Sequence, residues 1–331
     1  MGDCPRAAIT GCGLHLPEKV LTNFDLEKMV ETSDEWILTR TGIAQRRMAR
    51  PDQAASDLAL PASRQALQEA GLQPTDLDAI IVATMTPDMI FPSTACYLQG
   101  ALGAAPCAAF DLLAACSGYV YALSVAQALI VAGQARHVLA VASEALTKIT
   151  DYQDRTSCIL FGDGAGATVV SAAPPGAPRE VLYTTLGADG GNGGSMVLPA
   201  GGSRTPTSHE TVDQRLHYIR LRGREVFNLA VRKIVEVVNQ CLAACGLTHQ
   251  DVDLLVPHQM NLRIIRASAE RLEIPMEKVF VNIDRYGNTG AATVPIAIHE
   301  AHTNGLVKQG DIVVLVTFGG GLSWSGAVLR W

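Results

Sequence analysis

Three side chains that can do chemistry each lie just before a predicted helix. Cys116 lies in "DLLAACSGYVYALS", between a short apolar run and an Ala-rich stretch. His258 ends the apolar run "LLVPH", Asn288 lies in the turn "YGNTG", and each precedes a predicted helix. A thiolate is a nucleophile, and a neutral imidazole and an amide can both donate hydrogen bonds to an oxygen that becomes negative. The set therefore indicates thiol-first chemistry on a carbonyl group.

Each of these residues also has a purely structural explanation when it is taken alone. Cys116 is then a small core residue, His258 a hydrogen-bonded core histidine and Asn288 a helix cap. If the helix begins at or just after Cys116, however, free N–H groups and a partial positive charge face the sulfur. Such a position favours the thiolate over the thiol.

Composition predicts a globular protein and excludes several classes. Of the 331 residues, 48% are hydrophobic and 18% are charged, and the net charge of −6 argues against a broad nucleic-acid surface. The N-terminus shows no signal peptide, and no run approaches a bilayer span. The eight cysteines lie mostly in apolar runs without a paired framework, and the spacing of Cys241 and Cys245 is not a usual zinc pair. We therefore expect reduced thiols and a cytoplasmic protein.

An internal repeat predicts how the three side chains are brought together. Residues 71–82 ("GLQPTDLDAIIV") resemble residues 246–257 ("GLTHQDVDLLVP") at an offset of 175 (246 minus 71). The same offset lays residues 116–142 over residues 291–317, two helix-like stretches that each lead into an apolar strand. Near-continuous apolar strands predict sheets covered by helices on both faces.

These features predict a layered α/β fold made of two similar halves about a pseudo-twofold axis. We expect an N-terminal half over residues 1–174 with the cysteine, and a C-terminal half over residues 216–331 with the histidine and asparagine. The Gly/Pro/Ser-rich stretch 175–215 is expected to be a loop-rich junction. Strand ends from both halves would then line one site.

Six segments spread over the chain resemble the β-ketoacyl-acyl carrier protein synthase III family in sequence and order. They are "TSDEWILTRTGI", "AACSGYVYAL", "ILFGDGAGA", "VPHQMNLRII", "DRYGNTGAATVP" and "FGGGLSW". The resemblance implies a thiolase-like duplicated fold with αβαβα layers. It also implies condensation of an acyl-CoA primer with malonyl-acyl carrier protein, with loss of carbon dioxide, to a 3-oxoacyl-acyl carrier protein that initiates fatty acid synthesis.

The resemblance assigns a role to each catalytic residue. Cys116 would carry the acyl group, and His258 and Asn288 would hydrogen-bond the malonyl thioester carbonyl. The backbone N–H groups of Cys116 and Gly320 would form the oxyanion hole, and Phe318 would be the gate between the two reaction regions. The resemblance implies no metal or redox cofactor.

It also implies positions for substrates and partners. The residues similar to the family's CoA contacts are Thr32, Trp36, Arg40, Arg155, Gly223, Phe227, Asn261 and Ile264. Arg263 and Arg266, with Arg220, Arg222 and Arg224, would dock the acidic carrier protein, although Glu270-Arg271 replaces a common pair of basic residues. Phe91 resembles the residue that reaches across a homodimer interface to cap the partner's primer tunnel.

Other functions are also compatible with the sequence. A specialised family member would start a polyketide or transfer the acyl group to another nucleophile, and acetyl and short branched primers are both compatible with the sequence. A carrier-protein scaffold has no use for the three catalytic side chains. A dinucleotide oxidoreductase is disfavoured, because "FGDGAGATVV" leads into a β-branched strand rather than a helix.

Overall fold

Nine strands form one continuous sheet in the computed structural model, which describes residues 5–331 apart from the side chains of residues 192 and 223–226. In order across the sheet, the strands are β11 (Leu254–Pro257), β12 (Ile312–Gly319), β13 (Ser323–Arg330), β8 (Glu180–Ala188), β1 (Arg6–His15), β7 (Asp163–Ala173), β6 (His137–Ala145), β4 (Ala79–Ala83) and β5 (Ala108–Leu112). Two small sheets pair β2 (Lys19–Thr22) with β3 (Gln45–Met48) and β9 (Met196–Val197) with β10 (Arg220–Leu221).

The same pairing pattern occurs at both ends of the large sheet. Strand β4 is parallel to β5 and β6, and β11 is parallel to β12, whereas β7 and β13 run antiparallel to β6 and β12. The two groups of strands meet at β1 and β8, which share the register pair Ala8↔Glu180. The sheet is therefore two similar units joined along one short edge.

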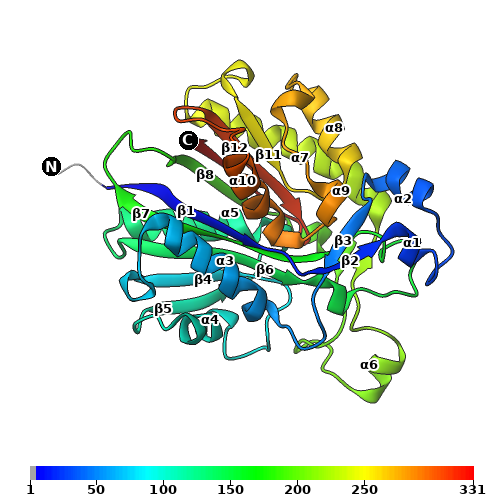
Figure 1. The fold of residues 1–331 in the computed structure, drawn as a ribbon. Helices are drawn as coiled ribbons and strands as arrows, with labels where there is room; N and C mark the ends of the chain where they lie inside the picture. Colours follow the sequence, from blue (N-terminus) through cyan, green and yellow to red (C-terminus); the bar gives the residue numbers. More distant parts are fainter. Residues whose placement is uncertain (1–4) are drawn as a thin grey trace.

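Helices cover both units (Figure 1). The longer ones are α3 (Ala55–Ala70), α4 (Thr94–Leu102), α5 (Gly118–Val131), α7 (Gly223–Ala244), α8 (Leu262–Arg271) and α10 (Thr293–Thr303), and the shorter ones are α1 (Asn23–Leu26), α2 (Asp34–Thr41), α6 (His209–Asp213) and α9 (Ile283–Tyr286). Within residues 5–331, no helix combines the length and apolar character that crossing a membrane requires.

Alternation along the strands produces five layers. Ile81 of β4 and Val313 of β12 belong to one central core with residues of α5 and α10. Ile80 packs on the opposite face of its strand with α3 and α4, and Val314 does the same with α7 and α8. Because successive side chains of a strand point to opposite faces, each unit is covered on both sides. The fold is the thiolase-like duplicated αβαβα arrangement that was predicted.

The offset of 175 residues recurs in the bounds of the elements. Strand β11 begins 175 residues after β4, α10 after α5, and β12 after β6. The short 3₁₀ turns η2 (Ala115–Ser117) and η7 (Gly290–Ala292), which precede α5 and α10, have the same separation. The repeat in the sequence is therefore a repeat of structure.

Two local features were not predicted from the sequence. The stretch 175–215 contains β8, a nine-residue strand between β13 and β1, because "EVLYTTLGA" is rich in the β-branched and aromatic residues that suit strands. In the second half, the counterpart of β5 is reduced to an isolated bridge, Leu255↔Val279. Beside this bridge, the side-chain amide of Gln259 holds the chain in place of a strand ladder. It donates a hydrogen bond to Phe280 O and accepts one from Asn282 N–H. The division of the chain at residues 174 and 216 stays a prediction.

The glycine-rich stretch "FGDGAGATVV" lies at the start of β7, as a structural role predicts. A Cβ atom at Gly166 would stand 2.7 Å from Pro295 Cβ, which is closer than real Cβ contacts. The glycines therefore let α10 pack directly on β7.

Candidate active site

The nucleophile lies on a sharp turn between a strand and a helix. Strand β5 ends at Leu112, and Cys116 occupies the middle of turn η2 directly before α5. Ala115 has a φ of 45°, in the left-handed region that residues with a Cβ rarely adopt. Cys116 is only 2% exposed because the end of β12 crosses over it, where a Cβ at Gly319 would stand 2.7 Å from Cys116 Cβ. The turn therefore presents the sulfur to a closely packed site.

The surroundings of Cys116 favour the thiol rather than the expected thiolate. Burial raises the pKa of the Cys116 thiol to about 12, and the charge of Glu144 acts in the same direction. Hydrogen bonds from the backbone N–H groups of Gly320 and Cys116 to the sulfur lower the pKa, but by less than burial raises it. The thiol is thus the stable form here, and the expectation of a thiolate was wrong, since it weighed the helix terminus without the burial. The two N–H groups that converge on the sulfur are the pair predicted for the oxyanion hole.

His258 lies at the carboxyl end of β11. Its backbone N–H donates to Val316 O at 2.8 Å, which continues the pairing of β11 with β12 for one residue. The ring atom Nδ1 lies 2.6 Å from Thr293 Oγ1, and Nε2 is buried with no hydrogen-bond partner among the described residues. Burial lowers the pKa of His258 to about 3, so the ring is neutral at physiological pH. The unpartnered atom Nε2 belongs to a residue that lines the pocket beside Cys116.

Asn288 is held by the backbone on both sides. Its N–H donates to Leu160 O at 2.9 Å, and its carbonyl accepts from Gly162 N–H at 3.1 Å. The side-chain atom Oδ1 accepts from Gly290 N–H at 2.9 Å. Because Oδ1 is taken by the turn, the amide group Nδ2 is the end available to a ligand. The side chain therefore both caps turn η7 and offers a donor.

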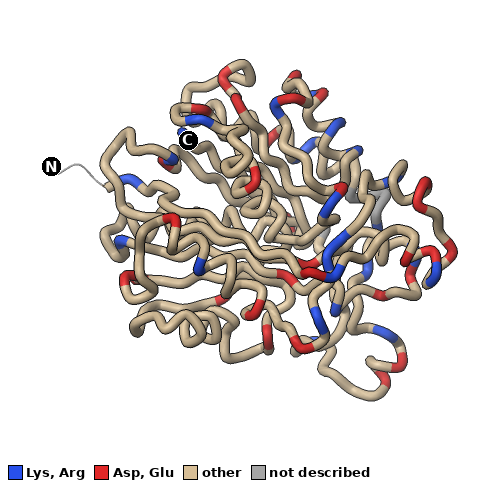
Figure 2. Tube along the Cα trace, in the orientation of Figure 1, with Lys and Arg blue, Asp and Glu red and all other residues tan. Residues whose placement is uncertain are grey.

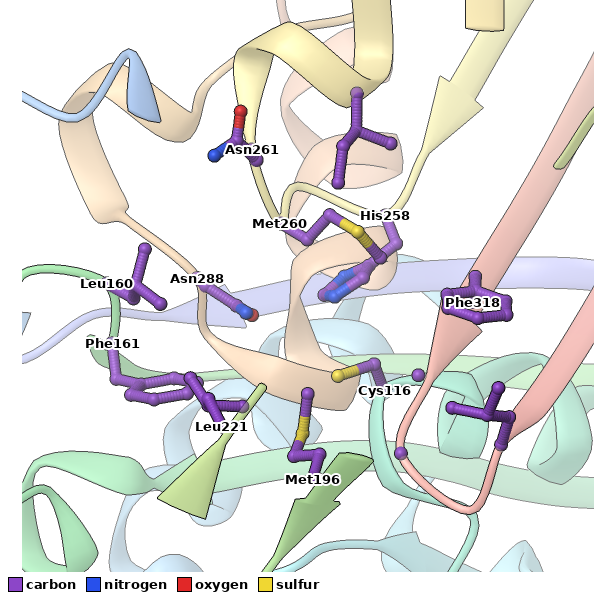
Figure 3. A pocket seen from close by; sticks show the side chains of 14 residues that line it. Cys116, Leu160, Phe161, Met196, Leu221, His258, Met260, Asn261, Asn288 and Phe318 are labelled. Carbon is purple, nitrogen blue, oxygen red and sulfur yellow. The ribbon is translucent and has the colours of Figure 1, made fainter. Parts of the chain in front are cut away.

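One pocket brings these side chains together (Figure 3). Cys116, His258 and Asn288 converge on it from three separate elements, and Phe318 forms part of its wall. Its other lining residues are mostly apolar: Leu160, Phe161, Met196, Leu221, Met260, Asn261, Ile264, Gly319, Gly320 and Leu322. A nucleophile and two neutral donors thus face one apolar space, which strengthens hydrogen bonds to a developing charge.

The residues predicted to bind CoA lie partly at this pocket. Asn261 and Ile264 line it, and Asn261 also caps α8 by accepting from Arg263 N–H at 2.9 Å. Phe227 lies under the Arg263 guanidinium, 5.7 Å from ring centroid to Cζ. Thr32 has a buried hydroxyl with no partner in the part of the chain that the structure describes, and the predicted contact of Gly223 lies outside that part.

Trp36, Arg40 and Arg155 form a stack of their own. The guanidinium carbons of Arg155 and Arg40 lie 5.1 and 5.8 Å from the centroid of the indole ring. An aromatic base between Trp36 and Arg155 needs two stacking distances of about 3.5 Å each, or roughly 7 Å. Arg155 must therefore move away from Trp36 before a base can enter between them.

The positions predicted for carrier-protein docking separate into two kinds. Arg263 and Arg266 are exposed on α8, and Figure 2 shows basic residues along that helix. Arg220 instead lies 3.7 Å from the buried Asp151 carboxylate and donates to Arg215 O, so its charge is already used within the chain. Arg222 is exposed, and the side chain of Arg224 lies outside the described residues.

Phe91 does not line the pocket of its own chain. It is 82% exposed, beside Ile90 at 84%. An apolar space next to the active site is lined by Met85, Leu113, Phe161 and Met196 among others, and Phe91 is not among its lining residues. An exposed apolar pair of this kind suits a residue that serves a second copy of the chain.

Three residues that support the site were not singled out from the sequence. Thr293 holds His258, Gln259 fixes the chain after β11, and Glu144 accepts from the backbone N–H groups of Met85 and Ala291 at 3.0 and 3.4 Å. Each contact except that of Gln259 joins segments that lie 35 or more residues apart. The offset of 175 would have indicated Thr293, since it aligns with the residue that opens α5.

A duplicated, layered α/β fold whose halves bring a cysteine, a histidine and an asparagine to one apolar pocket defines a thiolase-like condensing enzyme. Two family models match the chain: "3-Oxoacyl-[acyl-carrier-protein (ACP)] synthase III" over residues 110–190 and its C-terminal counterpart over residues 242–331. The chain belongs to the 3-oxoacyl-[acyl-carrier-protein] synthase III family.

Relatives support this assignment along the whole chain. The β-ketoacyl-[acyl-carrier-protein] synthase III of Caldanaerobacter subterraneus subsp. tengcongensis is 54% identical over 325 residues, 98% of each chain. The crystal structure of 3-oxoacyl-[acyl-carrier-protein] synthase III from Aquifex aeolicus VF5 matches at a TM-score of 0.90 and 46% identity, over 98% of this chain and 100% of that one. The priming β-ketosynthase of the R1128 polyketide pathway matches at a TM-score of 0.91 and 34% identity, over 99% and 97%.

Proposed function

We propose that this chain condenses an acyl-CoA primer with malonyl-acyl carrier protein to give 3-oxoacyl-acyl carrier protein, carbon dioxide and free CoA, and so initiates fatty acid synthesis. The observation that carries the proposal is the shared pocket in which Cys116 faces an unpartnered imidazole nitrogen and an amide. The close relatives that bear the name of this activity over nearly their full length support it.

In the first step, the sulfur of Cys116 attacks the thioester carbonyl of the primer. The backbone N–H groups of Cys116 and Gly320 stabilise the tetrahedral oxyanion. The bond to the CoA sulfur then breaks, and the proton of the Cys116 thiol leaves with CoA as its thiol. The acyl group remains on Cys116 as a thioester.

In the second step, malonyl-acyl carrier protein loses carbon dioxide. Asn288 Nδ2–H and His258 Nε2–H donate to the thioester carbonyl oxygen, which becomes the enolate oxygen as the carboxylate leaves. Both donors are neutral and lie in an apolar pocket. Their hydrogen bonds to this oxygen therefore strengthen as its negative charge develops. No residue needs to remove a proton from malonyl, since the departing carboxylate supplies the electron pair.

In the third step, the enolate carbon attacks the acyl-cysteine. The new carbon–carbon bond forms and the oxyanion again faces the N–H groups of Cys116 and Gly320. When the oxyanion collapses, the bond to the Cys116 sulfur breaks, and the sulfur leaves as a thiolate that takes up a proton from solvent to restore the thiol. This sequence requires no metal or redox cofactor. Among residues 5–331, no group of three or more His, Cys, Asp and Glu is arranged to hold a metal ion.

The same proposal covers the partners and the compartment. The stack of Trp36, Arg40 and Arg155 receives the nucleotide end of CoA, and Arg263 and Arg266 of α8 meet the acidic carrier protein. Phe91 of one protomer caps the primer space of its partner in a cytoplasmic homodimer. Phe318 separates the decarboxylation region from the condensation region.

A second candidate is the start of a polyketide chain with the same chemistry. The likeness to the R1128 priming β-ketosynthase at 34% identity favours it, whereas the greater identity to the synthase III relatives favours fatty acid synthesis. The two differ in primer and carrier protein rather than in the catalytic residues.

Intact-mass measurement tests the proposal directly. The protein is mixed with acetyl-, isobutyryl- and hexanoyl-CoA, and the mass shift and the modified cysteine identify the primer. Malonyl-acyl carrier protein from fatty acid and polyketide systems is then added, and the 3-oxoacyl product is measured. A Cys96→Ser variant is the control, because Cys96 is exposed and does not line the pocket. Absence of any acyl adduct on Cys116 would contradict the proposal.

A further inference from the structure

The proposed function, on which this inference rests, requires His258 to carry its single proton on Nε2. A neutral imidazole has one N–H, and the tautomer decides whether the nitrogen facing the pocket donates or accepts. The decarboxylation step needs a donor there. Something must therefore hold Nδ1 in its unprotonated form.

Within the described residues, the one hydrogen-bond partner of His258 Nδ1 is the hydroxyl of Thr293, at 2.6 Å. Both residues are buried, with exposed fractions of 1% and 2%. A threonine hydroxyl can donate or accept, so the distance alone leaves two arrangements. In one, the hydroxyl donates to Nδ1 and Nε2 is protonated. In the other, it donates to a carbonyl and accepts from Nδ1–H.

The alternative acceptor is Gly290 O, 3.1 Å from Thr293 Oγ1. This carbonyl already accepts the backbone N–H of Thr293 in turn η7. It does not need the hydroxyl to be satisfied, and it is the more distant of the two acceptors. In both arrangements His258 Nδ1 keeps its hydrogen bond to Thr293 Oγ1, but only the first leaves a proton on Nε2 that can be donated to the thioester oxygen.

The corresponding positions of the first half show that this contact is a specific addition. At an offset of 175, His258 aligns with Ala83 and Thr293 with Gly118. There the two backbones pack with no room to spare, since a Cβ at Gly118 would lie 2.9 Å from Ala83 Cβ. The fold brings these two positions together in both halves, and only the half that supplies the donors fills them with a hydrogen-bonded pair.

We infer that Thr293 is a positioning residue, whose hydroxyl donates to His258 Nδ1 and so fixes the Nε2–H tautomer and the orientation of the ring toward the malonyl thioester.

The tautomer can be observed without any substrate or variant. In protein labelled with ¹⁵N-histidine, the imidazole resonances of His258 are assigned by their loss in His258→Asn. The expected spectrum has an unprotonated Nδ1 and a protonated Nε2. A protonated Nδ1 in the wild-type protein overturns the inference.

The kinetic test compares Thr293→Val, which removes only the hydroxyl, with Thr293→Ser, which keeps it. Thr293→Val should slow malonyl decarboxylation about 100-fold through kcat, as expected for the loss of one oxyanion donor, and should leave acylation of Cys116 by acyl-CoA within about twofold. Thr293→Ser should restore decarboxylation and the wild-type tautomer.

The matched control is Thr303→Val. Thr303 ends the same helix, and its hydroxyl bonds His299 O in the way that a helical threonine usually does. It should change neither measurement. Unaltered decarboxylation in Thr293→Val alongside an active wild-type protein overturns the inference alone. Failure of the wild type to form an acyl-enzyme or product overturns the proposed function instead, and the NMR result still decides the tautomer.

Discussion

Turns η2 and η7 occupy the same place in the two halves and differ in what they carry. Each precedes a central helix, α5 or α10, and each begins with a residue of positive φ: Ala115 at 45° and Gly290 at 56°. The next position holds Cys116 in the first half and Ala291 in the second. The duplicated fold therefore offers two equivalent turns for a nucleophile, and the chain uses one of them.

The residues around the two turns also differ between the halves. The carboxyl end of β6 carries Glu144, and the equivalent residue of β12 is Gly319. Glu144 reaches across to accept from Ala291 N–H at 3.4 Å, whereas Gly319 makes room for Cys116. The end of β4 is Ala83, and its equivalent is His258. At each of these equivalent positions, one half thus carries a small residue and the other a functional residue. The active site results from these differences.

Removal of the nucleophile should have the largest effect. Cys116→Ala should abolish the acyl-enzyme and lower product formation by at least about 1,000-fold, because no other thiol lines the pocket among the described residues. The double variant Cys116→Ala/Ala291→Cys sharpens the comparison of the turns. It should not recover activity, since the backbone N–H of residue 291 already donates to the Glu144 carboxyl group, whereas the two N–H groups that face the sulfur belong to Cys116 and Gly320. Recovery of an acyl adduct at position 291 would contradict this account.

Removal of either donor of the second half should separate the two partial reactions. His258→Ala and Asn288→Ala should each reduce malonyl decarboxylation about 100- to 1,000-fold, because one of two neutral donors to the enolate oxygen is lost. Acyl transfer from acyl-CoA should remain measurable, since its oxyanion is held by backbone groups. Carbon dioxide release and intact mass are measured in parallel. His249→Ala, outside the pocket, is the control.

Addition of one methyl group should disturb the nucleophile turn from the other half. Gly319→Ala places a Cβ 2.7 Å from Cys116 Cβ, so the turn must shift. We expect acylation to slow about 100-fold, as for a misplacement of about 1 Å, and the free energy of unfolding to fall by about 1–3 kcal/mol. Gly100→Ala on α4, where a Cβ meets nothing within 4 Å, should instead be neutral or stabilising.

The buried titratable residues of the two halves should give opposite pH dependences of stability. Burial raises the pKa of Glu144 from 4.5 to about 8, so the folded state binds the extra proton and stability falls as pH rises through this window. Burial lowers the pKa of His258 from 6.5 to about 3, so stability rises with pH between these values. Each slope approaches about 1.4 kcal/mol per pH unit. Denaturation curves of Glu144→Gln and His258→Asn should each lack one slope, and an unchanged pH profile in either variant would show that its group does not titrate as stated.

The sequence predicted the parts of the site that reside in local segments. Cys116 and His258 each follow an apolar run, Asn288 lies in a glycine-containing turn before a helix, and the offset of 175 placed their strands and helices in register. The contact of His258 with Thr293 and that of Glu144 with Ala291 could not be predicted, because they depend on how distant segments pack. The predicted direction of the Cys116 pKa shift was wrong for the same reason. The thiol is buried by the end of β12, which lies more than 200 residues away in the sequence.

The smallest expected effect concerns the first residue of each turn. The left-handed φ of 45° at Ala115 costs about 1–2 kcal/mol, whereas Gly290 adopts a φ of 56° without a Cβ and so without this cost. Ala115→Gly relieves that strain but adds about 0.5–1 kcal/mol of backbone entropy, so a net stabilisation of about 0.5–1 kcal/mol is expected from chemical denaturation. Gly290→Ala should destabilise by more than about 1 kcal/mol, because its Cβ adds contacts of 2.9 Å with Met85 Cε and 3.0 Å with Glu144 Oε1 to the same strain. Equal and opposite shifts in the two variants would mean that the turns differ only in backbone strain, whereas a larger loss at Gly290 shows that Glu144 fills the space beside the second turn.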